Sequence, residues 1–330
     1  MPRFLRPLLT LALAVSAAQA QWEGDVRLTS DPRFSTTSFN AARSMTVSGS
    51  VLHIAWSDDR DGNREIYYKR STDDGAHWGG DVRLTQNAAT SIFPSIAAAG
   101  ADVHVVWEEY RDGNAEIYYK RSSDGGATWG PDTRLTFQSS SSFSPSIAAA
   151  ASGVHLVWFD QRDGNTEIYY KRSTTAGASW EGDTRLTTDS AASLYPAVAI
   201  VGSRVHVAWE EHRDGNGEIY YRQSADGGST WESATRLTAS AGASLSPAVS
   251  GSGPLVHVVW HDERDGNQEI YDKRSRDGGQ TWGTDTRLTN RAGASSYASV
   301  RVSGLKDQVT AGVVDTPPDG LSPQEARENE

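Results

Sequence analysis

One set of side chains that could bind a ligand occurs five times in this chain, each copy 51 residues after the last. Every copy holds a tryptophan, an acidic residue two positions later and an arginine two positions after that. The tryptophans are Trp56, Trp107, Trp158, Trp209 and Trp260, the acids are Asp58, Glu109, Asp160, Glu211 and Asp262, and the arginines are Arg60, Arg111, Arg162, Arg213 and Arg264. An indole ring can stack on a sugar, and guanidinium and carboxylate groups can hydrogen-bond its hydroxyls. This interpretation predicts equivalent carbohydrate sites whose affinity comes from multivalency.

Two other interpretations of the same segment remain open. In the first, the Asp and Asn of each "RDGN" close a turn and the arginine pairs with carboxylates, so that the segment only holds a hairpin together. In the second, Asp59, Asp61, Asn63 and Glu65 alternate as calcium ligands would, although position 59 has no acidic equivalent in the next three copies. We therefore expect no metal ion and no cofactor, with calcium as the weak alternative.

A few residues beside the hairpins break the repeat and could contribute to a unique site. They are Tyr110, His212, His261 and Glu263, together with Tyr195 on a loop that enters another copy. The first entry loop, residues 30–43, is five residues longer than its equivalents. An ordinary surface role is the simplest explanation for each, but Tyr110, His212 and His261 join the repeated residues as ligand-binding candidates.

These residues are positioned by short strands. Within residues 83–129, the runs "RLT", "PSIAAAG", "VHVVWEE" and "AEIYYKRS" read as strands, separated by the turn sequences "RDGN" and "SDGGAT". Four short strands in each repeat, without helical periodicity, predict a β-propeller blade. The chain has five complete copies, and its two ends, "WEGDVRLT" (22–29) and a segment near "QVTAGVVD" (308–315), supply parts of a sixth. We therefore predict an all-β, six-bladed propeller of four-stranded antiparallel blades, with an incomplete sixth blade closed by the N- and C-terminal strands.

The second turn carries its own motif. "SSDGGATW" (122–129), "SADGGSTW" (224–231) and "SRDGGQTW" (275–282) are close copies of one another, whereas "STDDGAHW" (71–78) and "STTAGASW" (173–180) depart from them at His77 and Thr175. Short polar side chains can hydrogen-bond backbone amides in such a turn, glycine allows a positive φ, and tryptophan fills the gap between strands. A structural role is therefore expected for Ser71, Asp73, Trp78, Ser122, Asp124, Trp129, Trp180, Ser224, Asp226, Trp231, Ser275, Asp277 and Trp282.

This motif resembles the Asp-box of the sialidase-like, or BNR-repeat, superfamily, and the resemblance covers about residues 22–315. It implies a six-bladed propeller whose active site lies opposite the Asp-boxes, on the face that carries the "RDGN" hairpins. A sialidase-type glycoside hydrolase would need an arginine trio, a Tyr–Glu nucleophile pair and an aspartic acid/base. The family's Arg-Ile-Pro motif is not in the sequence, and "DPRF" (31–34) is the nearest match. We therefore predict a binding or interaction module for glycans or surface polymers, with an exo-sialidase as the alternative.

The N-terminal sequence and the overall composition indicate where the protein is located and which partners are excluded. Residues 1–20 combine Arg3 and Arg6, a short apolar run and an "AQA" cleavage signature, which is typical of a secretory signal peptide. We expect export to the periplasm or the extracellular space, a propeller over residues 21–315 and a polar tail at 316–330. The chain has no cysteine, and its net charge of −11 argues against nucleic acid as a partner. No other segment is apolar enough to span a membrane, and we expect a monomer.

Overall fold

The computed structural model describes residues 27–29, 31, 33–37, 44–290, 292–302 and, for the backbone alone, 309–315. The chain divides into two units, Met1–Ser30 and Asp31–Glu330. In the first unit, Arg27 Nε donates a hydrogen bond to the Thr29 carbonyl at 2.6 Å, and residues 27–29 form no strand. The predicted signal peptide, the rest of the predicted strand at 22–29 and the predicted tail lie outside the described residues. All that follows concerns the second unit.

The regular elements described in this unit are all β-strands, grouped into successive sheets that we call blades. The first blade contains β1 (Ser35–Thr36), β2 (Met45–Ser48), β3 (Val51–Asp58), β4 (Glu65–Ser71) and β5 (Val82–Arg83). The second contains β6 (Ser91–Ala99), β7 (Asp102–Glu109), β8 (Glu116–Ser122) and β9 (Thr133–Arg134), and the third β10 (Ser142–Ala150), β11 (Gly153–Asp160), β12 (Glu167–Ser173) and β13 (Thr184–Arg185). The fourth contains β14 (Ser193–Val201), β15 (Arg204–Glu211), β16 (Glu218–Ser224) and β17 (Thr235–Arg236). The fifth contains β18 (Ser244–Ser252), β19 (Leu255–Asp262), β20 (Glu269–Ser275) and β21 (Thr286–Arg287), and a last sheet pairs β22 (Ser295–Val302) with β23 (Val309–Asp315).

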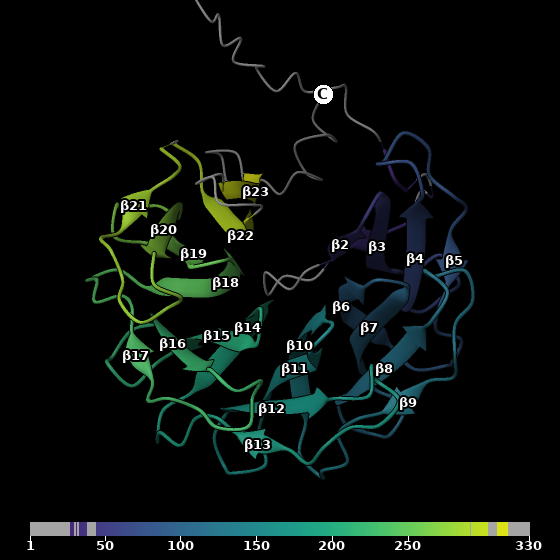
Figure 1. The fold of residues 1–330 in the computed structure, drawn as a ribbon, viewed down its shortest axis with the longest axis horizontal. Helices are drawn as coiled ribbons and strands as arrows, with labels where there is room; N and C mark the ends of the chain where they lie inside the picture. The colour runs from purple at the N-terminus through teal and green to yellow at the C-terminus, as the bar shows by residue number, and fades with distance from the viewer. Residues whose placement is uncertain are drawn as a thin grey trace, which may run out of the picture. The chain divides into compact units, whose positions relative to one another are not determined.

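The blades follow one another around a common centre (Figure 1). Strands within each blade are antiparallel and in chain order. The first strands contact each other from blade to blade, since β6 touches β2 and β10, and β14 touches β10 and β18. These strands are therefore innermost, whereas the short strands β9, β13, β17 and β21 lie at the periphery. The predicted propeller of four-stranded blades is confirmed, while closure by the chain ends stays a prediction because the last sheet has two described strands.

The core lies between neighbouring blades because successive residues of a strand point to opposite faces of its sheet. On β7, Val103, Val105 and Trp107 belong to one cluster with Tyr68 of the first blade. Val106, the residue between them, belongs to a different cluster, with Trp158 of the third blade. The second blade is therefore covered on both faces by its neighbours, and such burial explains the nearly continuous apolar runs in the second strand of the repeats.

A bulge interrupts the innermost strand of the second to the sixth blades. The register shifts between Ile92 and Ser95 in β6, and equivalent shifts occur in β10, β14, β18 and β22. The bulge residues have left-handed backbones with φ of 48–55°, and they are Phe93, Ser144, Tyr195, Ser246 and Tyr297. Thr36 and Ser44 of the first blade are equivalent to Ile92 and Ser95 of the second. Seven residues, 37–43, separate the first pair, whereas only Phe93 and Pro94 separate the second. The five extra residues predicted for this loop therefore fall at the position of the bulge.

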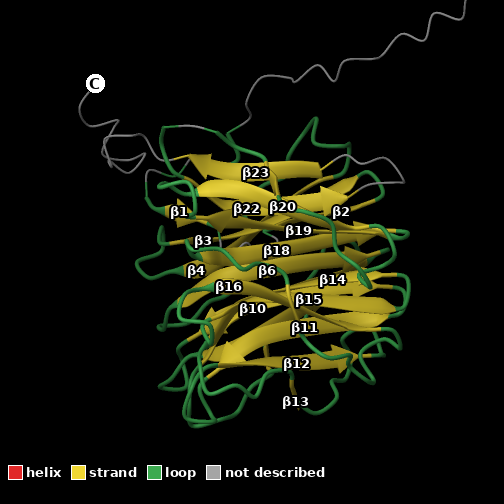
Figure 2. Cartoon of the chain, turned by 90° about the vertical axis from the view of Figure 1, so that its left-hand side faces the viewer, coloured by secondary structure: helices red, strands yellow, loops and turns green. Residues whose placement is uncertain are grey.

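Seen from the side, the strands run across the unit and their connections gather at two ends (Figure 2). Asn63, in the hairpin between β3 and β4, donates hydrogen bonds to the carbonyls of Asn87 and Ala89, in the loop that enters the second blade. The "RDGN" hairpins and the entry loops therefore share one end, as predicted, and we call it the hairpin end. The Asp-box turns follow the opposite end of β4, β8, β12, β16 and β20, and we call that side the box end.

Candidate functional site

The repeated arginine is paired within its own blade. Arg60 donates from Nε to Asp58 Oδ1 at 2.8 Å and from Nη2 to Asp58 Oδ2 at 2.6 Å, while its Nη1 reaches Asp81 at 2.7 Å. The indole Nε1 of Trp56 donates to the same buried Asp58 at 3.0 Å. Burial raises the pKa of Asp58, but the hydrogen bonds from Arg60, Ser35 and Trp56 outweigh it and hold that pKa well below its usual range. The charge of this arginine is therefore largely compensated inside the protein.

The other copies follow the same arrangement. Arg111, Arg162 and Arg264 each bridge the acid of their own repeat and an aspartate 21 residues downstream, at 2.6–2.9 Å. Arg213 instead pairs with Asp189 at 2.9 Å and lies 4.0 Å from Glu211. Each guanidinium also lies 4.1–4.5 Å from the centre of a tyrosine ring in its own blade. These contacts correspond to the hairpin-holding interpretation of the sequence.

The tryptophans of this set do not offer a stacking face. Trp56 is 3 % exposed, and Trp107, Trp158, Trp209 and Trp260 are 0 % exposed. Trp107, Trp158, Trp209 and Trp260 each pack against side chains of the preceding blade, as Trp107 does beside Tyr68, and Trp56 packs against Tyr67 of its own blade. The prediction that these rings stack against a sugar is therefore wrong, because the alternation of β-strand side chains directs them into the core.

The residues considered for calcium are engaged with other side chains. Asp61 accepts a hydrogen bond from the Tyr67 hydroxyl and lies 2.9 Å from Nη1 of Arg83. Glu65 accepts from Asn63 at 3.1 Å and pairs with Arg83 Nη2 at 3.0 Å. Within the described part of the chain, no group of three or more His, Asp or Glu residues is arranged to hold a metal ion.

The Asp-box turns of the second to fifth blades pack against the blade before them. Asp124 accepts hydrogen bonds from the backbone and hydroxyl of Thr128 at 2.9 and 2.6 Å and from Ser122 at 2.7 Å. Gly126 has a φ of 79°, and a Cβ there would lie 2.0 Å from the hydroxyl of Tyr68, which comes from the preceding blade. The same tyrosine meets Trp129 edge to face, with ring centres 4.9 Å apart. Such contacts are those of a structural turn, the role expected from the motif.

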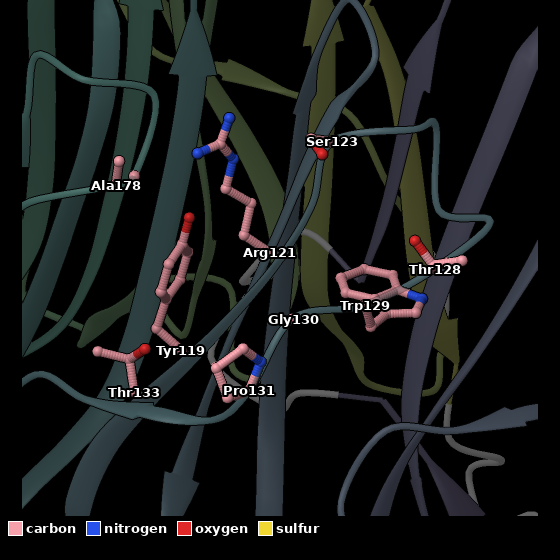
Figure 3. A pocket seen from close by; sticks show the side chains of 10 residues that line it. Tyr119, Arg121, Ser123, Thr128, Trp129, Gly130, Pro131, Thr133 and Ala178 are labelled. Atoms are coloured by element: carbon pink, nitrogen blue, oxygen red, sulfur yellow. The ribbon is translucent and has the colours of Figure 1, made fainter.

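Two grooves lie at opposite ends of this part of the propeller. The first, of about 450 Å³, is at the box end between the second and third blades, and its walls include Tyr119, Arg121, Trp129 and Ala178 (Figure 3). The second, of about 410 Å³, is at the hairpin end. It is lined by Ser139, Ser140 and Ser141 of an entry loop and by Gln161, Gly164, Asn165 and Thr166 of the adjacent hairpin. Hydroxyl and amide groups dominate the second groove.

The residue that follows each repeated tryptophan differs between blades. These residues are Ser57, Glu108, Phe159, Glu210 and His261; Ser57 pairs with Thr36 beside the break in the first blade, and the other four stand near the bulge of their own innermost strand. Their described contacts reach the bulge of the following blade. Glu108 accepts a hydrogen bond from the Ser144 amide at 3.0 Å, and Glu210 accepts from the Ser246 amide at 3.1 Å. The rings of Phe159 and His261 meet Tyr195 and Tyr297 with centres 5.7 and 5.6 Å apart.

The two glutamates of this set, Glu108 and Glu210, each have a second partner on the hairpin of their own blade. The Tyr110 hydroxyl donates to Glu108 Oε1 at 2.8 Å, and His212 Nε2 is hydrogen-bonded to Glu210 Oε1 at 2.7 Å. Because both glutamates reach bulges of the innermost strands, they belong to the centre of the propeller rather than to one hairpin. We define the axial cluster as Glu108, Tyr110, Tyr195, Glu210, His212, His261 and Tyr297.

Burial perturbs the titration of this cluster. Glu108 is 2 % exposed, and burial raises its pKa to about 6 against the opposing effect of its two hydrogen bonds. Burial also raises the pKa of Glu210 and lowers that of His261 to about 4. The pKa of Tyr195 is raised first by burial and then by Glu210, Tyr297 and Glu108, so this phenol lies within electrostatic reach of all three. Perturbed carboxyl groups of this kind are typical of binding and catalytic sites.

The axial cluster contains all the candidates that were chosen because they break the repeat, except Glu263. Glu263 accepts a hydrogen bond from Gln268 at 3.2 Å and acts electrostatically on His261. Sequence reasoning missed Glu108, Glu210 and Tyr297. A signal was present, since the position after each tryptophan changes from copy to copy while its neighbours stay nearly constant.

Comparison with known proteins supports the fold. No protein-family model and no curated protein matches the chain. Among solved structures, a Hadza microbial sialidase is 17 % identical, with a TM-score of 0.55 over 79 % of this chain and 61 % of that one. A Trypanosoma rangeli sialidase is 14 % identical with a TM-score of 0.57 over 86 % and 53 %, and the NanB sialidase from Streptococcus pneumoniae is 10 % identical with a TM-score of 0.57 over 82 % and 65 %.

The matched region spans between about half and two thirds of these three sialidase chains. At such low identity the likeness concerns the fold and not the activity. Among the described residues, no helix is long and apolar enough to cross a membrane. The resemblance in the Asp-boxes and the likeness in three dimensions agree, and the chain has a sialidase-like β-propeller fold.

Proposed function

We propose that this chain is an exported module that binds glycans or other hydroxyl-rich polymers at its hairpin end, with the axial cluster as the binding centre. The observation that supports it most is the placement of Glu108 and Glu210. Both carboxylates are nearly buried, both are held by bulge amides of a neighbouring blade, and both stand where the other three repeats have serine, phenylalanine and histidine. The repeated arginines and tryptophans are less suited to a ligand because their polar groups and rings are already engaged.

The chemistry of the hairpin end fits a polyhydroxylated ligand. Carboxylates accept hydrogen bonds from sugar hydroxyls, and tyrosine rings can pack against the apolar face of a sugar. Tyr110 and Tyr297 are 38 % and 39 % exposed, so part of each ring is accessible to a ligand. The polar groove lined by Ser140, Gln161 and Asn165 offers additional hydrogen-bonding groups at the same end. A ligand that extends from the centre to this groove would contact several blades at once.

A glycan array tests the proposal. The protein is applied to the array alongside the double variant Glu108→Gln, Glu210→Gln and the control Glu181→Gln, which changes an exposed glutamate paired with Arg172 at the box end. The proposal predicts glycan binding that the double variant loses and the control retains. Binding that is equal in all three proteins, or no binding to any glycan or surface polymer, would contradict it.

One observation favours glycoside hydrolysis as a second candidate. The Tyr110 hydroxyl lies 2.8 Å from Glu108, and a hydrogen-bonded Tyr–Glu pair is one part that a sialidase-type site needs. The repeated arginines, however, are each paired with an aspartate or glutamate, so they do not supply the arginine trio. Release of a fluorophore from a sialoside, abolished by Tyr110→Phe, would establish this candidate. A lack of turnover across sialosides and other glycosides would refute it.

A further inference from the structure

We infer that the axial cluster recognises a primary ammonium group, so that the preferred ligand is a glycan built from amino sugars rather than from acidic sugars. The inference rests on the proposed function, because it assigns a ligand class to the same site. It is carried by the sign of the charged groups, by the aromatic faces beside them and by one buried imidazole nitrogen without a partner.

The described partners of Glu108 leave its negative charge uncompensated, and those of Glu210 include a histidine but no lysine or arginine. Glu108 is held by a backbone amide and a phenol, both neutral, whereas Glu210 is held by a backbone amide and by His212, which forms an ion pair with it when the imidazole is protonated. None of these described hydrogen bonds comes from a lysine or an arginine. The repeated acids of the hairpins do have a cationic partner, since Arg60 binds both carboxylate oxygens of Asp58. A buried carboxylate without a cation favours a ligand that supplies one.

The axial cluster also contains tyrosines, and the hydroxyl of one of them, Tyr110, donates to Glu108. Tyr195 is influenced electrostatically by both Glu108 and Glu210, and Tyr297 packs against His261. The π-faces of tyrosines attract organic cations, and they do so more strongly when the cation is removed from water. Two carboxylates together with tyrosine faces therefore suit an ammonium, which can donate hydrogen bonds to the carboxylates and lie against a ring.

His261 gives independent support for a ligand. Its side chain occupies the same register position as Glu108 and Glu210, and its ring meets Tyr297 at the next bulge, so it is directed into the cluster. The residue is 4 % exposed, and its Nδ1 is buried without a hydrogen-bond partner among the described residues. Burial keeps this imidazole neutral by lowering its pKa, so one ring nitrogen can accept a hydrogen bond. An ammonium or hydroxyl of the ligand would satisfy that nitrogen.

Calorimetric titration with chitosan oligosaccharide, which is made of glucosamine units, and with its N-acetylated counterpart tests the inference near neutral pH. The two probes differ in whether the nitrogen can take up a proton and become an ammonium. We expect the glucosamine oligomer to bind the full chain at least about tenfold more tightly. Glu108→Gln and Glu210→Gln should each reduce that preference, and together they should abolish it. Glu181→Gln, with the same change of charge at the box end, should leave it intact.

The outcomes separate the inference from the proposed function. Equal affinity for both probes, or tighter binding of the N-acetylated oligomer, overturns the inference while leaving glycan binding in place. Failure of both probes to bind overturns the inference, and the glycan array then decides whether another glycan is bound. A preference for glucosamine that survives the double variant shows that the ammonium is recognised elsewhere and refutes the assignment to this cluster. Full displacement of the oligomer by calcium chloride, but not by sodium chloride of equal ionic strength, would identify the site as one for a metal ion and would also refute it.

Discussion

Replacing Glu108 with glutamine should stabilise the protein near neutral pH. Burial raises the pKa of Glu108 from its ordinary 4.5 to about 6, because the ionised carboxylate loses its water and gains no cation. One pKa unit corresponds to about 1.4 kcal/mol, so ionisation of this group costs the folded state about 2 kcal/mol. Glutamine has the same size and stays neutral. Its amide oxygen can still accept from Ser144, and its amide nitrogen can donate to Tyr110.

The direction of the pH dependence follows from the raised pKa. Below the unfolded pKa the carboxyl is protonated in both states and adds no difference. As the pH rises through the interval from the unfolded to the folded pKa, the unfolded chain releases its proton first and the free energy of unfolding falls. Glu108→Gln removes this loss. The variant should therefore match the parent at about pH 4 and exceed it by about 2 kcal/mol at about pH 7.

Urea unfolding over this pH range measures the free energy of unfolding of the parent and the variant. The contributions of the other carboxylates are the same in both proteins and cancel in the difference. Glu181→Gln is the matched control and should give no comparable change, since Glu181 is an exposed partner of Arg172. A variant that is less stable than the parent at neutral pH, or a difference that is independent of pH, would show that ionisation of Glu108 does not destabilise the folded state. A positive result would also show that the chain retains a destabilising carboxylate, which is common at binding sites.

Three further predictions concern the scaffold. Gly126→Ala should lower the free energy of unfolding by about 2–4 kcal/mol in urea unfolding, because the new Cβ meets the Tyr68 hydroxyl at a φ of 79°. Gly113→Ala, with a φ of 94° and no atom within 4 Å of the new Cβ, should lose only about 1 kcal/mol, and equal losses would contradict this account. Asp160→Ala should lower stability by about 3–5 kcal/mol because it removes the buried acceptor of the Trp158 indole N–H and one of the two carboxylates that pair with Arg162, leaving only Asp183. Adding Arg162→Met should restore part of that loss, and the same urea titrations would show it. Trp107→Ala should lower the free energy of unfolding by about 3–5 kcal/mol. At a temperature where the variant stays folded, its glycan affinity should match that of the parent, because the Trp107 ring is 0 % exposed. A selective loss of affinity would restore the interpretation that this ring stacks on a sugar.

The sequence was sufficient to predict the blades because local signals determine them. Asp, Asn and Gly at fixed offsets specify the two turns, and the 51-residue spacing places each turn at the same point of every blade. The arginine pairings were also accessible, since Arg60 and Asp58 are two residues apart and must lie at the same hairpin. The box-end turns followed from their own side chains. Each of these features depends on residues that are close together in the chain.

Four members of the axial cluster were sequence candidates, but their convergence with Glu108, Glu210 and Tyr297 could not be predicted in this way because it depends on contacts between blades. Glu108 and Ser144 are 36 residues apart, and their contact depends on how the bulge of one blade faces the second strand of another. The stacking role of the tryptophans was wrong for a related reason, since the fold decides which face of a strand is covered. Within a repeat, the changing residue after each tryptophan looks like ordinary variation, and only the positions of the bulges show that these changes converge.

The break in the first innermost strand has a practical consequence. Strands β1 and β2 both remain paired with β3 although seven residues separate Thr36 from Ser44. A segment can therefore be inserted at this point of a blade without changing the register on either side of it. The equivalent points at Phe93, Ser144, Tyr195 and Ser246 offer places where peptides of chosen sequence can be grafted, one blade at a time, to give the scaffold new recognition surfaces.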